Sequence, residues 1–335
     1  MKAAVAKQKG APLVLEERPL PEPGEGAVRI RVHACGICHS DQFVVEGIWP
    51  SLKLPRVPGH EVAGVVDAVG PGVRHVQPGA RVGVGWYGGH CGVCRACREG
   101  DFVLCENGPV TGISFDGGYE EYMLAPASAL AMIPEGLDFA EAAPLLCAGV
   151  TTFNSLRNSG ARAGDVVAVH GLGGLGHLGV QFARAMGFYV VAIARGAEKA
   201  DLAKKLGAHE YLDATQGDMI KGLQKLGGAS VILSTAVSGQ AASELVNGLG
   251  RNGCLVVLGA SPDPITIRAG SLIGGRRRIQ GWPSGQASDS EDTLRFAQLH
   301  GIRPRIETFP LAEAQAAYQH MMQGKARFRA VLKAI

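Results

Sequence analysis

Apolar and polar positions divide the chain into two parts with different patterns. Up to about residue 150, short alternating stretches such as residues 27–34 and 62–69 are interrupted often by proline and glycine. This pattern is typical of antiparallel strands in a β-rich domain. From Thr151 onward, apolar runs such as residues 166–170 alternate with helix-compatible segments such as residues 198–206. The second part therefore predicts a doubly wound parallel sheet.

The clearest local signal lies where one apolar run meets one helical pattern. Residues 166–170 predict a buried strand, and residues 175–186 carry apolar side chains at helical spacing. The glycines between them fit G-x-G-x-x-G, so backbone N–H groups at the start of the helix can meet a pyrophosphate. A second apolar strand follows at residues 188–194, as in dinucleotide-binding units. The residues expected to bind the dinucleotide here are Gly171, Gly173, Gly174, Leu175 and Gly176.

Length and charge narrow the class of protein. A chain of 335 residues, 46% of them hydrophobic, has enough apolar material for two globular domains. Its formal net charge of +3 is small for that length, which argues against nucleic acid or an anionic membrane as a partner. We find no signal-peptide pattern and no stretch of roughly 18 apolar residues that would span a membrane. We therefore expect a cytoplasmic protein whose eight cysteines are metal ligands or buried thiols rather than disulfides.

Four of the cysteines are closely spaced in a short, glycine-rich lobe at about residues 89–108. They are Cys91, Cys94, Cys97 and Cys105. Four thiolates can close a tetrahedron around zinc and leave no open position, which is the pattern of a structural site. An iron–sulfur cluster also uses four cysteines, but the compact loop without a nearby redox partner favours zinc.

A second set of metal-binding residue types is dispersed along the chain. A catalytic zinc needs three protein ligands and a vacant fourth position. Cys38, His60 and Cys147 could supply two thiolates and one imidazole. Cys35 could replace Cys38, and Glu61 could act as an occasional oxygen ligand, so these residues alone leave the ligand set open.

Five segments occur together in a familiar order and spacing. They are CGICHSD (35–41), GHE (59–61), CGVCRAC…C (91–105), LLCAGVTT (145–152) and GLGGLG (171–176). On these segments the chain resembles the zinc-containing alcohol dehydrogenases of the medium-chain dehydrogenase/reductase family over essentially its whole length. The resemblance implies an α/β protein with a Rossmann-type dinucleotide-binding domain at 151–289. It also implies a β-rich, GroES-like catalytic zinc domain built from residues 1–150 and 290–335.

The resemblance implies a specific ligand set and two zinc ions per subunit. The cysteine directly before the H-[ST]-D triplet is the family's ligand, which is Cys38 and not Cys35. His60 and Cys147 are the other ligands, and Glu61 corresponds to a carboxylate that can approach the metal. Asp41 corresponds to the residue that orients the zinc-bound histidine. Cys35 and Cys254 are then small buried residues.

The same resemblance implies a proton route and a substrate pocket. Ser40 corresponds to a hydroxyl that contacts the alcohol and passes its proton outward. The family's relay histidine is replaced by Phe43, so we assign no side-chain base beyond Ser40. Trp49 and Trp86 resemble aromatic residues that line the substrate channel, with plain core packing as the alternative. Two indoles would favour small primary or slender secondary alcohols, and aromatic alcohols and aldehydes also remain candidates.

Further residues resemble the family's contacts with the cofactor. They are His39 at a phosphate, Thr151 at the nicotinamide and Arg329 at the pyrophosphate. Residues 190–196 contain no carboxylate, and Ala194 stands where relatives that prefer NAD carry aspartate. The guanidinium of Arg195 could pair with a 2′-phosphate, or it could stack on adenine or face solvent. We therefore favour NADP(H) over NAD(H), with dual use as the alternative.

The expected protein is a zinc-dependent, NAD(P)-linked alcohol dehydrogenase. It would transfer hydride between the nicotinamide and a primary or secondary alcohol, aldehyde or ketone. One alternative is an aldehyde or ketone reductase that uses the same site with NADPH, and another is a non-catalytic zinc-binding regulatory protein. The family resemblance also implies a homo-oligomer, with a tetramer expected and a dimer as the alternative.

Overall fold

A computed structural model describes residues 1–217 and 219–335. The chain forms two compact units. Unit 1 comprises Met1–Val150 and Ser284–Ile335, and unit 2 comprises Thr151–Pro283. The chain thus returns to unit 1 at Ser284, whereas the sequence analysis expected this at residue 290. Within the described residues, no helix is long and apolar enough to cross a membrane.

Unit 2 is built on a six-stranded parallel sheet with the strand order β10–β9–β8–β11–β12–β13. Strands β8, β9 and β11 are almost entirely buried, which is why the sequence shows them as continuous apolar runs. The strands are β8 (Val166–His170), β9 (Tyr189–Ala194), β10 (Glu210–Asp213), β11 (Ala229–Ser234), β12 (Leu249–Val257) and β13 (Arg278–Gly281). The helices of this part are α4 (Val150–Arg157), α5 (Gly176–Ala185), α6 (Ala200–Lys205), α7 (Met219–Lys225), α8 (Gly239–Leu245) and α9 (Ala269–Ile273).

The order of these strands reverses at one place. The chain runs from β8 outward through β9 and β10, then returns to place β11 on the other side of β8. Ligands of such sheets bind beyond the carboxyl ends of the strands where this reversal occurs. The glycine-rich segment 171–176 leaves β8 at that end, so the fold puts it where a dinucleotide site is expected.

Unit 1 holds a seven-stranded sheet in which the path β14–β15–β3–β4–β5–β7 is joined by β6, which pairs with β3. All of its pairings are antiparallel except β14 with β15. The strands are β3 (Ala27–Gly36), β4 (Val62–Val69), β5 (Arg81–Val84), β6 (Tyr122–Pro126), β7 (Ala131–Met132), β14 (Ile306–Pro310) and β15 (Arg329–Lys333), beside a separate pair β1 (Lys2–Val5) and β2 (Val14–Glu17). The α-helices are α1 (Gln42–Val45), α2 (Arg95–Arg98), α3 (Phe139–Pro144), α10 (Ala287–Leu299) and α11 (Ala314–Met322).

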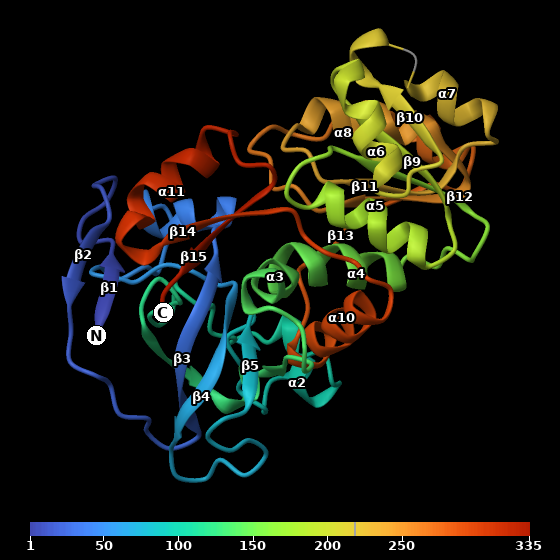
Figure 1. The fold of residues 1–335 in the computed structure, drawn as a ribbon. Helices are drawn as coiled ribbons and strands as arrows, with labels where there is room; N and C mark the ends of the chain where they lie inside the picture. Colours follow the sequence, from blue (N-terminus) through green and yellow to red (C-terminus); the bar gives the residue numbers. More distant parts are fainter. Residues whose placement is uncertain (218) are drawn as a thin grey trace. The chain divides into compact units, whose positions relative to one another are not determined.

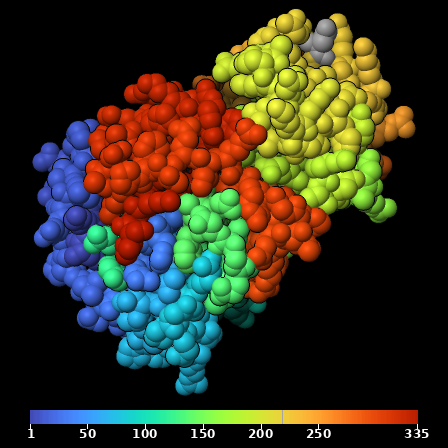
Figure 2. Space-filling model, viewed as in Figure 1, coloured from blue at the N-terminus to red at the C-terminus, as the bar shows by residue number. Residues whose placement is uncertain are grey.

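The C-terminal strand completes the sheet of unit 1. Strand β15 lies antiparallel beside β3, with Leu332 opposite Cys35 (Figure 1). Buried Ala330 and Leu332 belong to the same apolar cluster as Ile30 of β3. On the face drawn in Figure 2, red C-terminal residues lie directly against blue N-terminal ones. Both ends of the chain therefore build unit 1, which contains all the predicted zinc ligands.

Candidate functional site

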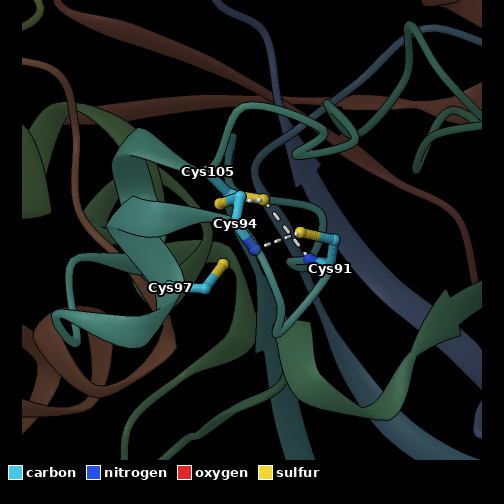
Figure 3. Close-up of side chains that lie close together, drawn as sticks. All are labelled: Cys91, Cys94, Cys97 and Cys105. Carbon is cyan, nitrogen blue, oxygen red and sulfur yellow. Dashed lines mark hydrogen bonds between the residues drawn. The ribbon is translucent and has the colours of Figure 1, made fainter.

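Four cysteine side chains converge in a small lobe of unit 1. Their sulfur atoms lie within 4.8 Å of one another, and Figure 3 shows them gathered around a common centre. The Sγ atoms of Cys94 and Cys105 are 3.9 Å apart. The backbone N–H of Cys94 donates to Cys91 Sγ over 3.4 Å, and Cys97 lies on the short helix α2. The lobe therefore presents four thiols to one point.

The electrostatics of this lobe fit a bound cation. Hydrogen bonds from the backbone N–H groups of Val93 and Cys94 lower the pKa of the Cys91 thiol to about 6. Burial, in contrast, raises the pKa of Cys97 to about 12. The thiols therefore do not all ionise together unless a cation lies between them. Four thiolates that leave no open position are the donor set of a structural zinc site.

A second cluster of metal-binding side chains includes Cys38 and His60. Antiparallel strand pairing brings these two residues together. Cys38 follows the end of β3, and His60 precedes the start of β4. These strands are neighbours with Cys35 opposite Val62, so the end of one strand lies beside the start of the next. Cys38 and His60 are 22 positions apart in sequence (60 minus 38), yet the sheet makes them neighbours.

Cys147 completes this cluster from another part of the chain. It lies in a π-helical turn, Leu145–Gly149, which follows α3. Such turns are rare and occur often at functional sites. One ligand atom from each of Cys38, His60, Glu61 and Cys147 lies within 4.8 Å of the others. The two sulfur atoms are 3.8 Å apart, so unit 1 brings all three expected ligands and Glu61 together.

The two thiols of this cluster interact strongly. Their hydrogen bond lowers the pKa of Cys38 well below its usual value and raises the pKa of Cys147 well above its usual value. Without a cation the two thiols therefore do not ionise together. A divalent cation would allow both to ionise, because thiolates are the form that binds metal.

The imidazole of His60 is held in one orientation by Asp41. Nδ1 of His60 lies 3.0 Å from Oδ1 of Asp41. Burial lowers the pKa of His60, but the charges of Asp41 and Cys38 outweigh burial and raise the pKa well above its usual value. Nε2 of His60 is buried and has no hydrogen-bond partner among the described residues. A buried nitrogen without a partner, beside two thiols, fits a metal ligand.

Glu61 forms a buried ion pair with Arg329. Nη2 of Arg329, on β15, contacts Oε1 of Glu61. Oε2 of Glu61 has no hydrogen-bond partner in the part of the chain that the structure describes. A Cβ on Gly36 would lie 2.0 Å from this oxygen, so only glycine leaves room for the carboxylate. Burial is the main reason that the pKa of Glu61 rises to about 7.

Three aromatic rings form a wall beside His60. The ring centroid of Trp86 lies 5.0 Å from that of His60, at an interplanar angle of 89°. Trp49 lies 5.9 Å from Trp86, and Phe43 lies 5.5 Å from Trp49. Phe43, which occupies the place expected for a relay histidine, is therefore a packing partner of both predicted pocket residues. Ser40 is half-buried, in the turn that links Cys38 to Asp41.

The glycine-rich segment of unit 2 has the geometry that its sequence requires. Gly171 has a φ of +95°, which favours glycine. A Cβ on Gly176 would lie 1.7 Å from the carbonyl oxygen of Gly171, so the close turn between them excludes any larger residue. A Cβ on Gly173 would meet no described atom within 4 Å. Gly173 therefore leaves space for close approach of a ligand to the backbone.

Two carboxylates from outside residues 190–196 lie near the end of β9. Ala194 ends β9 and Arg195 is exposed. Oδ1 of Asp213, at the end of neighbouring β10, accepts a hydrogen bond of 3.0 Å from Gly196 N. A Cβ on Gly196 would lie 2.1 Å from Oε2 of Glu198. The fold thus places two acidic groups beside Gly196, the residue after Arg195, and residues 190–196 contain neither of them.

The remaining predicted residues occupy less constrained positions. His39 is exposed at the start of the turn after Cys38, and Thr151 is the second residue of α4. Cys35 and Cys254 are buried free thiols, as the sequence analysis expected. One contact was missed by the sequence analysis: the hydroxyl of Tyr119 donates to Asp41 Oδ2 over 2.8 Å. No motif in the sequence includes Tyr119, so no local signal could have found it.

Comparison with known proteins identifies two family models in the chain. Residues 24–135 match the alcohol dehydrogenase GroES-like domain, and residues 174–298 match the zinc-binding dehydrogenase domain. The chain is 46% identical over 332 residues to the alcohol dehydrogenase notN of Aspergillus sp. (strain MF297-2), covering 99% of this chain and 97% of that protein.

Two solved structures are similar over nearly the whole chain. A cinnamyl alcohol dehydrogenase of Sorghum bicolor, SbCAD4, superposes with a TM-score of 0.91 at 32% identity, covering 99% of this chain and 97% of that one. An NAD-dependent alcohol dehydrogenase superposes with a TM-score of 0.92 at 30% identity, covering 99% of each chain. The similarity therefore includes both units.

Proposed function

Because the chain belongs to the zinc-containing alcohol dehydrogenases of the medium-chain dehydrogenase/reductase family, we propose that Cys38, His60 and Cys147 hold its catalytic zinc. The observation that carries this proposal is the buried Nε2 of His60, which has no partner among the described residues and lies beside two sulfur atoms 3.8 Å apart. The relatives favour an alcohol dehydrogenase over a reductase or a non-catalytic zinc protein.

Each residue of this site has a distinct task in the proposal. A zinc ion at this position supplies Lewis acidity toward an alcohol oxygen. Asp41 holds Nδ1 of His60 and so directs Nε2 toward the ligand cluster. Arg329 holds one oxygen of Glu61 and leaves the other without a partner among the described groups, so Glu61 is an occasional ligand rather than a permanent one. Ser40 accepts the alcohol proton and passes it outward.

A second zinc belongs to the four-cysteine lobe. Cys91, Cys94, Cys97 and Cys105 supply four sulfur donors within 4.8 Å of one another. The proposal is therefore two zinc ions per subunit, with a structural role for this one. Its contribution is to hold the lobe, because a metal that binds only the folded form stabilises that form.

The aromatic wall limits which alcohols fit. Phe43, Trp49 and Trp86 pack edge to face beside His60, and they offer an apolar surface rather than polar anchors. We propose small primary and slender secondary alcohols as substrates, together with aromatic primary alcohols. The similarity to a Sorghum bicolor cinnamyl alcohol dehydrogenase supports the aromatic class.

The cofactor is proposed to be NADP(H), with NAD(H) as the alternative. The segment 171–176 would bind the pyrophosphate through backbone N–H groups, and Thr151, His39 and Arg329 are the further proposed contacts. Exposed Arg195 after Ala194 supports a 2′-phosphate. Asp213 keeps NAD(H) open as the alternative: hydrogen bonds from Thr215 and Gly196 to its Oδ1 lower the pKa of this carboxyl, so it carries a negative charge at the end of β10.

The proposal also includes a homo-oligomer, with a tetramer expected and a dimer as the alternative. A reducing compartment such as the cytoplasm is supported by eight cysteines that are all free. Sedimentation velocity of the zinc-loaded protein measures the subunit number directly.

The test of the proposed site compares two neighbouring cysteines. Cys38→Ser should lower the zinc content from about two to about one per subunit and abolish alcohol oxidation. Cys35→Ser is the matched control, because Cys35 is also buried but is not in the ligand cluster; it should keep both zinc ions. Activity is measured with a panel of alcohols and aldehydes, using each cofactor. Full activity and zinc content in Cys38→Ser would contradict the assignment.

A further inference from the structure

Asp41 receives three hydrogen bonds in the interior of unit 1. Its Oδ1 pairs with His60 Nδ1 at 3.0 Å. Its Oδ2 accepts from the backbone N–H of Cys38 and from the hydroxyl of Tyr119, both at 2.8 Å. Asp41 thus contacts two of the proposed zinc ligands, and Tyr119 holds the oxygen that does not contact the histidine.

We propose that Tyr119 is a positioning residue for the catalytic zinc, acting through Asp41 on His60. This inference rests on the proposed assignment of Cys38, His60 and Cys147 as ligands. The hydroxyl of Tyr119 donates to Asp41, so its effect on the ligands passes through Asp41. The chain Tyr119–Asp41–His60 is joined by hydrogen bonds at each step.

The absence of a side chain at Gly59 leaves room for the ring of Tyr119. Gly59, directly before His60, has a φ of +104°, and a Cβ there would lie 2.4 Å from Cδ1 of Tyr119. A Cβ on Gly118 would lie 2.4 Å from Cγ2 of Val62, at the start of β4. The backbone is also fixed, because Tyr119 N donates to Pro58 O over 3.1 Å. The ring therefore packs against the segment that delivers His60.

Because both residues are buried, Asp41 depends on the hydrogen bond from the hydroxyl of Tyr119. Tyr119 is completely buried and Asp41 is 2% exposed, so water cannot readily replace a lost donor. A buried carboxylate that loses a donor is destabilised unless it moves to find another. Movement of Asp41 would release Nδ1 of His60 from its fixed orientation. Loss of such outer partners weakens metal binding in known sites.

The experiment removes only this hydroxyl. In Tyr119→Phe, zinc is released to a chromogenic chelator, and release is followed by absorbance. One zinc per subunit should leave about tenfold faster than in the parent enzyme, the low end of the effect known for partners of metal ligands. The other zinc should leave at the parent rate, because the hydrogen bonds of Tyr119 go to Asp41, Pro58 and Ala4, which lie outside the four-cysteine lobe. Cobalt placed in the catalytic position should show shifted visible absorption bands.

The chain offers a matched control. Tyr318 is another buried tyrosine of unit 1, 5% exposed, and its hydroxyl has no hydrogen-bond partner among the described residues. Tyr318→Phe should release both zinc ions at the parent rate and keep the parent cobalt spectrum. A thermal unfolding curve on each variant separates loss of metal from loss of fold.

The outcomes distinguish the inference from its premise. Equal release from Tyr119→Phe and the parent enzyme, with unchanged cobalt bands, would overturn the role of Tyr119 alone. A parent enzyme that binds only one zinc would overturn the proposed catalytic site itself. In an Asp41→Ala background, Tyr119→Phe should add no further acceleration; a full additional effect would show that Tyr119 does not act through Asp41.

Discussion

Two glycines of one turn give opposite predictions, because their surroundings differ. At Gly176 an added Cβ would lie 1.7 Å from the carbonyl oxygen of Gly171, a separation that no rearrangement of side chains relieves. At Gly173 an added Cβ would meet no described atom within 4 Å. Gly173→Ala should therefore leave folding intact, whereas Gly176→Ala should disrupt the turn between β8 and α5.

The open space at Gly173 sets the expected changes in stability and in cofactor binding for Gly173→Ala. Its backbone does not require a positive φ, so alanine is tolerated, and the free energy of unfolding should change by less than about 1 kcal/mol. The added methyl group would instead occupy the space proposed for the pyrophosphate. We expect the Kd for the cofactor to rise at least tenfold, which corresponds to about 1.4 kcal/mol of binding free energy. Gly176→Ala should lower the free energy of unfolding by several kcal/mol, since backbone atoms must move.

The assay measures both quantities on the same protein preparations. Thermal unfolding gives the change in stability, and titration calorimetry with NADP(H) and NAD(H) gives the Kd. Gly173→Ala with a parent Kd for both cofactors would refute the binding of pyrophosphate at this turn. Parent stability in Gly176→Ala would refute the steric argument, whatever happens to the cofactor.

Three other predictions concern chemistry, cofactor choice and the structural lobe. Ser40→Ala should lower turnover about 100-fold or more with little change in zinc content. Adding Phe43→His to Ser40→Ala should partly restore turnover, as measured in pH–rate profiles. Unaltered turnover in Ser40→Ala would exclude a role for Ser40 in proton transfer. Ala194→Asp should shift the kcat/KM preference toward NAD(H) about tenfold or more, checked by kinetics with both cofactors. Cys97→Ser should release one zinc and lower the Tm, checked by metal analysis and calorimetry.

Much of the sheet in unit 2 could be predicted because its strands are buried. Residues 166–170 predict a strand and form β8, and residues 175–186 predict a helix that appears as α5. Strand β10 (Glu210–Asp213) was missed, because each of its residues is only half-buried and it lacks a continuous apolar run. An edge strand of this kind depends on pairing with β9 rather than on its own pattern.

The candidate metal site was predictable only in part from the residues themselves. Cys38 and Cys35 are chemically identical choices in the sequence, and the family resemblance alone favoured Cys38. The fold distinguishes them by direction: Cys35 lies within β3 and is paired with Val62 and Leu332, while Cys38 lies beyond the strand end. The side chain of Cys35 is on the face of β3 that packs into the core of unit 1, whereas a residue after the strand end is free to turn toward His60.

The same reasoning explains why electrostatics near the cofactor could not be read from one segment. Residues 190–196 by themselves contain Arg195 and no carboxylate. Parallel pairing of β9 with β10 brings Asp213 opposite Ala194, and the turn after β9 folds Glu198 back against Gly196. Charge at a strand end is therefore a property of neighbouring strands together. Hydrogen bonds from Thr215 and Gly196 lower the pKa of Asp213 and so keep it negatively charged. A 2′-phosphate at this strand end would therefore meet both Arg195 and Asp213, and the choice between the two cofactors depends on both charges.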